Sequence, residues 1–133
     1  MASGRPEADV LDDEAMSLFC GEMKIRFAPR GLELFAELGF DDAHASFALA
    51  TEDCCFLVDR VRGSLLRDYH ELHRAVAKLA ALEPASRIFG ILLADADHAP
   101  PAELRRFGRR HGIAMADPQA ASGFIEEKLA EET

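Results

Sequence analysis

Two aspartates, Asp95 and Asp97, have the type and spacing of a divalent-metal site. Asp95 and Asp97 stand two residues apart just after an apolar run, and Asp59 ends an earlier one. Carboxylates placed just past strand ends supply the oxygen ligands that Mg²⁺ prefers, and bound Mg²⁺ promotes phosphoryl transfer. His98 follows the pair and adds an imidazole, which suits a transition metal. The alternative interpretation is structural, because paired acids before prolines also serve in turns and helix caps.

Basic side chains are concentrated in the middle of the chain. Residues 60–114 carry 10 basic and 6 acidic side chains, residues 1–59 carry 4 and 13, and the whole chain has net charge −9. An acidic protein is repelled by phosphate backbones and anionic bilayers, so nucleic-acid binding requires a fold that gathers the arginines on one side. The alternative is a set of solvated faces that balance nearby acids. The candidate nucleic-acid-binding residues are Arg60, Arg62, Arg105, Arg106, Arg109 and Arg110.

Length and composition favour one water-soluble domain. The chain has 133 residues, of which 49% are hydrophobic and 29% are charged, values typical of globular proteins. No apolar run approaches the ~20 residues of a membrane span, and the acidic start is unlike an export signal. With three cysteines, these features predict a cytoplasmic protein. We expect a disordered tail over residues 1–9 and a single α/β domain over residues 10–133.

The first half of the chain predicts a helix, a strand and a hairpin. Residues 10–19 form a short helix that Gly21 ends, and the alternating apolar residues of 23–27 indicate a strand. The segment 31–40, GLELFAELGF, fits both a helix and a strand, and we expect a helix closed by glycine. Two strand-like runs around a TED triplet predict an antiparallel hairpin over residues 45–61.

The second half alternates strands and helices. Such alternation predicts right-handed crossovers and a parallel part of the sheet. The fold class is therefore α/β: one mixed sheet, with an antiparallel hairpin followed by β-α-β-α-β-α and helices packed on the sheet. The expected elements after the hairpin are a helix from Ser64 to Pro84, a central strand over 87–94, a helix from Pro101 to Gly112 that buries Leu104, Phe107 and His111, a strand over 113–115 and a helix over 119–132.

One family resemblance rests on this order. The hairpin, the segment FLVDRVRG, the amphipathic helix, RIFGILLA and a helix ending in HGIAM resemble the restriction-endonuclease-like (PD-(D/E)xK) nuclease core over residues 41–116. In that family, an acid, any residue and a lysine follow the hairpin, and an earlier acid completes a Mg²⁺ site. The resemblance places Asp59 at the acid and Val61 at the lysine. Because valine cannot orient water or stabilise a phosphorane, it implies a fold without nuclease chemistry. The sequence does not single out the earlier acid, for which the candidates are Asp41, Asp42, Glu52 and Asp53.

A second resemblance involves the segment GILLADADHA. Asp95 and Asp97 after a buried strand look like the acid pair of a Toprim domain, which binds Mg²⁺ for phosphoryl transfer. The Toprim pattern also has a glutamate followed by glycine after an earlier strand. Asp59 followed by Arg60 stands in that place here, so the match is incomplete.

Histidines and cysteines give weaker signals. His70 and His73 stand three apart on one helix face, whereas a zincin helix has two histidines four apart. Cys54 and Cys55 are adjacent on a predicted strand, so their side chains point to opposite faces and exclude a simple disulfide.

Three functions are compatible with these patterns. The first is a non-catalytic interaction or regulatory module, which binds a protein partner, forms a homodimer and uses no cofactor. The alternative is a Mg²⁺-dependent nuclease or Toprim-like phosphoryl-transfer enzyme that uses Asp59, Asp95 and Asp97. The second alternative is a nucleic-acid binder that does not cleave.

Overall fold

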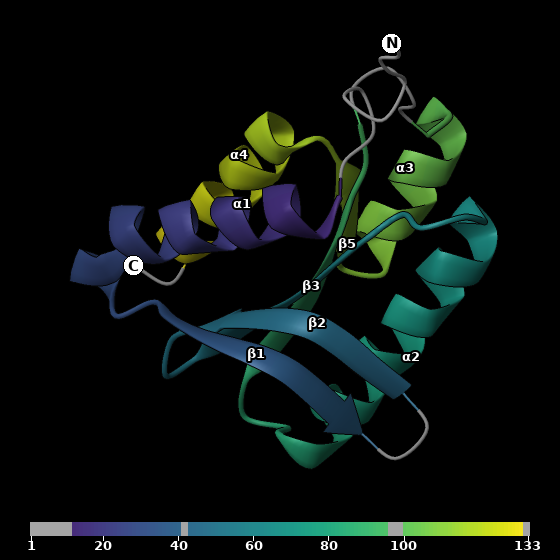
Figure 1. Ribbon diagram of the computed structural model, residues 1–133. Helices are drawn as coiled ribbons and strands as arrows, with labels where there is room; N and C mark the ends of the chain where they lie inside the picture. Colours follow the sequence, from purple (N-terminus) through teal and green to yellow (C-terminus); the bar gives the residue numbers. More distant parts are fainter. Residues whose placement is uncertain (1–11, 41–42, 96–99, 132–133) are drawn as a thin grey trace, which may run out of the picture.

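A computed structural model describes residues 12–40, 43–95 and 100–131, which form a five-stranded sheet in the order β1-β2-β3-β4-β5 (Figure 1). Strands β1 to β3 pair antiparallel, and strands β3 to β5 pair parallel, so β3 joins the two halves of the sheet. The strands are β1 (Glu33–Phe40), β2 (Ala43–Ala50), β3 (Cys54–Arg60), β4 (Arg87–Leu93) and β5 (Ile113–Ala116).

Helices cover both faces of the sheet. Helices α1 and α4 pack together on one face, and α2 and α3 pack on the other (Figure 1). Their bounds are α1 (Asp13–Arg26), α2 (Leu65–Leu82), α3 (Ala102–Arg110) and α4 (Pro118–Ala130), and a 3₁₀ turn, η2 (Ala28–Arg30), follows α1. In the described parts of the chain, no helix is long and apolar enough to cross a membrane.

The expected fold class is confirmed. The chain is an α/β domain with a mixed sheet, and β3-α2-β4-α3-β5-α4 follows the predicted alternation. Strand β4 lies between β3 and β5, and its residues Ile91, Leu92 and Leu93 are fully buried. The expected tail over 1–9 lies outside the described residues.

The predicted helix over residues 10–19 is confirmed from Asp13 onward, but its predicted end at Gly21 and the predicted strand over residues 23–27 are wrong. Helix α1 runs without interruption through Gly21 to Arg26, and the side chain of Asp12 caps it by accepting from the Ala15 N–H at 2.8 Å. Its buried residues are Met16, Phe19, Cys20 and Met23, a helical spacing. Ile25, which suggested a strand, is 77% exposed.

The predicted helix over residues 31–40 is also wrong. Strand β1 occupies this segment, and it pairs with β2 from Glu33 opposite Ala50 to Phe40 opposite Ala43. Gly31 adopts φ +83° at the end of the 3₁₀ turn, a conformation that turns the chain into the strand. Pairing with β2 therefore decided a segment whose local pattern suited both structures.

Helix α3 buries less than the sequence predicted. Leu104 packs against the core on the α2 side, but Phe107 is 48% exposed and His111 is exposed. A glycine makes the close approach instead, because a Cβ on Gly108 would lie 2.7 Å from Met115 Cε and 2.8 Å from the Ile113 carbonyl oxygen. Helix α3 therefore contacts β5 with its backbone.

Replacement of this glycine tests that contact. We expect Gly108→Ala to lower the free energy of unfolding by about 1–3 kcal/mol, because a backbone oxygen cannot move aside for the new methyl group. Gly123→Ala in α4 is the matched control, because its Cβ would meet nothing within 4 Å. The control is expected to stabilise the protein by about 0.5–1 kcal/mol. Equal effects in urea denaturation would contradict the close packing of α3 on β5.

Candidate functional site

Asp59 lies near the carboxyl end of β3 and is held from two strands. Ser46 on β2 lies beside it, because the neighbouring pair in the register is Phe47 opposite Val58. The Ser46 hydroxyl donates to Asp59 Oδ1 at 3.1 Å, and the backbone N–H of Arg60 donates to the same oxygen at 2.9 Å. The Asp59 side chain is only 15% exposed, so its charge needs these donors.

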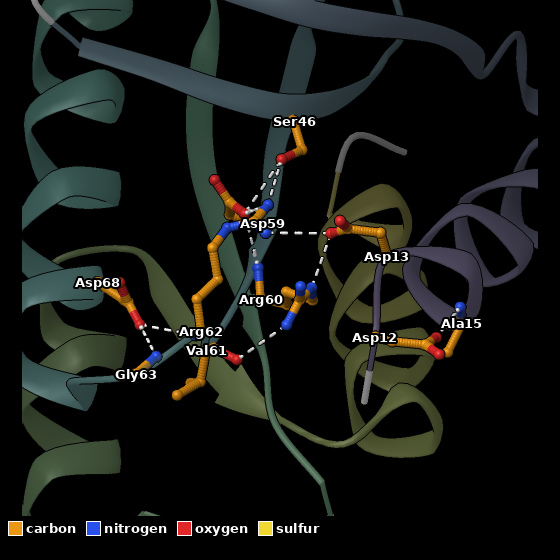
Figure 2. A network of polar contacts seen from close by, with 10 residues as sticks. All are labelled: Asp12, Asp13, Ala15, Ser46, Asp59, Arg60, Val61, Arg62, Gly63 and Asp68. Carbon is orange, nitrogen blue, oxygen red and sulfur yellow. Dashed lines mark hydrogen bonds and ion pairs between the residues drawn. The ribbon is translucent and has the colours of Figure 1, made fainter. Parts of the chain in front are cut away.

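A third donor to Asp59 is the guanidinium group of Arg62. Its Nη2 donates to Asp59 Oδ1 and to Ser46 Oγ, both at 2.8 Å, and its Nη1 donates to Asp13 Oδ1 at 3.0 Å (Figure 2). One positive group therefore links oxygen atoms from β2, β3 and the first turn of α1. We call Asp13, Ser46, Asp59, Arg60 and Arg62 the arginine-bridge network.

Arg60 completes the network on the α1 side. Its Nε donates to Asp13 Oδ1 at 2.7 Å, and its side chain is 17% exposed. The hydrogen bond from Arg60 and the charges of Arg60 and Arg62 hold the pKa of Asp13 below its ordinary value. Asp13 is also an acidic residue in the first turn of α1, where the helix dipole favours a negative charge.

A buried carboxylate shapes the loop that carries Arg62. Asp68 Oδ2 accepts from the backbone N–H groups of Arg62 at 2.8 Å and Gly63 at 3.2 Å (Figure 2). Asp68 is 8% exposed in the first turn of α2, which Ser64 caps by accepting from the Arg67 N–H. These bonds fix the loop after β3 and direct the Arg62 side chain back over the sheet.

Val61, at the lysine position of the nuclease resemblance, is part of the core. Its side chain is half-buried against the cluster on the α2 side, and its backbone N–H donates to the Leu93 carbonyl at 2.9 Å. The position therefore contributes packing, with no proton donor or charge.

Two of the three candidate aspartates, Asp59 and Asp95, are offset from each other along the sheet. Asp59 pairs with Leu92 across the β3–β4 ladder, so Asp95 lies three residues, roughly 10 Å, further along the strand direction. Asp97 and His98 lie outside the described residues. Among the residues that the structure does describe, no group of three His, Cys, Asp or Glu side chains has the arrangement of a metal site.

The six candidate arginines belong to different surroundings. Arg60 and Arg62 are engaged in the arginine-bridge network, and Arg109 pairs with Glu127 at 3.3 Å and lies over the Phe124 ring. The rest are Arg105, Arg106 and Arg110, exposed on α3. The predicted basic surface is therefore reduced to this helix.

His73 packs among aromatic rings, and the cysteines lie in or against the core. His73 stacks on Tyr69 with ring centroids 6.0 Å apart and meets His111 edge-on at 5.5 Å. Burial and the neighbouring histidines lower the pKa of His73. Burial raises the pKa of Cys20 to about 12 and that of Cys55 to about 11, the latter with help from Glu83. Neither thiol is therefore an activated nucleophile.

Adjacent cysteines on β3 face opposite sides of the sheet, as the sequence predicted. Cys54 belongs to the core under α1 and α4, and Cys55 packs against the cluster under α2.

Sequence reasoning singled out Asp59, Arg60 and Arg62, but it assigned them to separate roles. It missed Asp13, Ser46 and Asp68. Ser46 had a signal, because a hairpin closed at the TED triplet places a residue of the first strand opposite Asp59.

Comparison with known proteins gives no match: no family model, no curated protein and no solved structure matches this chain. The geometry of the arginine-bridge network therefore carries the functional argument.

The Asp13 carboxylate gives this geometry a pH signature. We expect Asp13→Asn to lower stability at neutral pH by about 1 kcal/mol or less, because the Asp13 side chain is 68% exposed and solvent screens its ion pairs. The pKa of Asp13 in the folded chain lies below its ordinary value of 3.8, so the stabilisation is present above that value and is lost as pH falls through the folded pKa. In thermal unfolding measured from neutral to acidic pH, the stabilities of wild type and Asp13→Asn should converge as the pH falls.

Glu14→Gln is the matched control for this experiment. Glu14 lies in the same first turn of α1 and makes no ion pair in the described part of the chain. The stability of Glu14→Gln should therefore differ from that of wild type by the same amount at neutral and at acidic pH. If Asp13→Asn remains less stable than wild type below the folded pKa of Asp13, the stabilisation does not come from the charge of the Asp13 carboxylate.

Proposed function

We propose that this chain is a non-catalytic interaction domain with a nuclease-like fold, in which an arginine side chain takes the place of a catalytic metal ion. The observation that carries the proposal is the Arg62 guanidinium, 2.8 Å from both Asp59 Oδ1 and Ser46 Oγ and 3.0 Å from Asp13 Oδ1. Oxygen atoms from three elements converge on one positive charge, as they do around a bound cation.

Competition between Arg62 and Mg²⁺ for these oxygen atoms favours the arginine. Mg²⁺ requires near-octahedral oxygen ligands at about 2.0–2.1 Å and loses its water reluctantly. To reach Asp59 it must displace a guanidinium that is attached to the same loop and already hydrogen-bonded. Because Arg62 is tethered a few residues from Asp59, it binds as an intramolecular group, with an effective concentration on the order of millimolar.

Two further features support a lost nuclease site. The antiparallel β1-β2-β3 meander, followed by α2 and a parallel β4, supports the resemblance to the restriction-endonuclease-like core. Where that family has a lysine, Val61 is packed into the core. A site with neither a free metal position nor a lysine lacks the groups that activate water and stabilise a pentavalent phosphate.

The proposed partner is another protein. A net charge of −9 disfavours phosphate backbones and anionic bilayers. A homodimer and a cytoplasmic location are part of this proposal, the latter because all three cysteines are free thiols and reduced thiols are typical of that compartment.

Nuclease and metal-binding assays test the proposal. Single- and double-stranded DNA and RNA should remain intact with Mg²⁺ or Mn²⁺, and calorimetry should detect no metal binding to the wild-type chain. Cleavage that Asp59→Ala abolishes, or metal binding that Asp95→Asn weakens, would instead establish the phosphoryl-transfer alternative.

Removal of the arginine should reveal a latent cation site. We expect Arg62→Ala to lose about 1–3 kcal/mol of stability, because Asp59 is left buried without its strongest donor. Millimolar Mn²⁺ should restore part of the lost thermal stability, and it should leave the wild-type chain unchanged. Arg109→Ala, which breaks the exposed pair with Glu127, is the control and should show no such rescue. If Mn²⁺ does not raise the thermal stability of Arg62→Ala, the proposal that Arg62 takes the place of a metal ion is refuted.

A further inference from the structure

Strand β1 leaves an open edge beside two hollows of the surface. Within the described residues, β1 is the outer strand of the sheet and pairs with β2 alone (Figure 1). Glu37 adopts φ +50°, which interrupts the extended backbone, so the regular part of the edge is residues 33–36. An unpaired edge of this kind offers backbone N–H and C=O groups to an added strand.

The first hollow is an apolar groove of about 390 Å³ on the α2 side, which we call the β1 groove. Its apolar walls include Phe35, Leu38, Leu79 and Ile88, and the exposed acids Glu52 and Glu83 lie among its lining residues. Phe35 is 47% exposed, so the groove leads directly onto the strand edge. Glu83 also raises the pKa of Cys55, which places its negative charge against the groove wall.

The second hollow is an acidic pocket of about 380 Å³ at the start of β1, lined by residues that include Glu33, Glu52 and Asp53. Arg30 also lines it, but the Arg30 guanidinium donates to the Leu129 carbonyl on α4. Since Glu52 lines both hollows, they adjoin, and four carboxylates surround one short stretch of strand edge.

We propose that this surface binds an extended peptide segment of a protein partner, with an apolar side chain in the β1 groove and lysine or arginine side chains at Glu33, Glu52, Asp53 and Glu83. This inference rests on the proposed interaction function and names the chemistry of its partner. Residues 33–36 would pair with the peptide backbone, which gives affinity, and the two hollows would select alternate side chains, which gives specificity.

Charge decides between this partner and a second copy of the chain through the same edge. Antiparallel pairing of two β1 edges over residues 33–36 would place Glu33 of both copies along one seam. Like charges across strands are destabilising. A basic segment has the complementary charge, and its binding should weaken as salt rises.

Selection from a random library of displayed short peptides against the full chain tests the inference. We expect enriched sequences that alternate apolar residues with lysine or arginine. A synthetic copy of the most enriched peptide should bind the double variant Glu52→Lys/Glu83→Lys at least roughly ten-fold more weakly than wild type. Phe35→Ala should weaken binding several-fold through loss of the groove wall.

The control is the double variant Glu71→Lys/Glu103→Lys, which makes the same change in net charge at exposed positions of α2 and α3. It should bind the peptide as wild type does, and all variants should keep cooperative thermal unfolding. No enrichment, enriched acidic peptides, or equal losses in both double variants would overturn the inference. Self-association of the chain that Glu52→Lys/Glu83→Lys abolishes would assign the surface to a second copy instead. These outcomes are independent of the metal and nuclease assays, because Phe35, Glu52 and Glu83 do not belong to the arginine-bridge network.

Discussion

The structure at the carboxyl end of β3 depends on one interaction, the bridge from the Arg62 guanidinium to Asp59, Ser46 and Asp13. It joins β2, β3 and α1 through one side chain, while Asp68 fixes the backbone that carries this side chain. A charged carboxylate that is 15% exposed is costly without such donors. Under the proposed function, the bonds that offset the burial of Asp59 also take the place of a catalytic metal ion, so the stability of this end of the sheet and the proposed loss of nuclease chemistry have one cause.

Much of the fold could be predicted from the sequence, and the wrong predictions of secondary structure have a common reason. The nearly continuous apolar run from Arg87 is bracketed by turn residues, and the stripe of α2 has a helical period; both predictions are confirmed. Residues 33–40 suit both a helix and a strand, and only the partner strand β2 decided between them. In α1, buried residues at helical spacing outweighed the alternation of Met23, Ile25 and Phe27, of which Ile25 is exposed. Local patterns therefore predict an element when packing agrees with them, and pairing decides the ambiguous ones.

The site was predictable only in part, because its geometry joins residues far apart in the chain. Asp59, Arg60 and Arg62 attracted attention by type, but the role of Arg62 depends on Asp13, which is 49 residues away. No local pattern in the sequence brings the start of α1 to the end of β3. Asp97 and His98 lie outside the described residues, so the Toprim resemblance keeps only Asp59 and Asp95 for comparison, and these are offset along the ladder.

Nuclear magnetic resonance of the arginine side chains in the wild-type chain tests the central claim most directly. A guanidinium held by three oxygen atoms rotates slowly, so the account predicts separate, slowly exchanging Nη resonances for Arg62 that stay in place as Mg²⁺ is added. Arg105, exposed on α3, provides the averaged signal of a solvated side chain in the same sample. Arg62 resonances that are averaged like those of Arg105, or that are released as Mg²⁺ rises, would contradict the account.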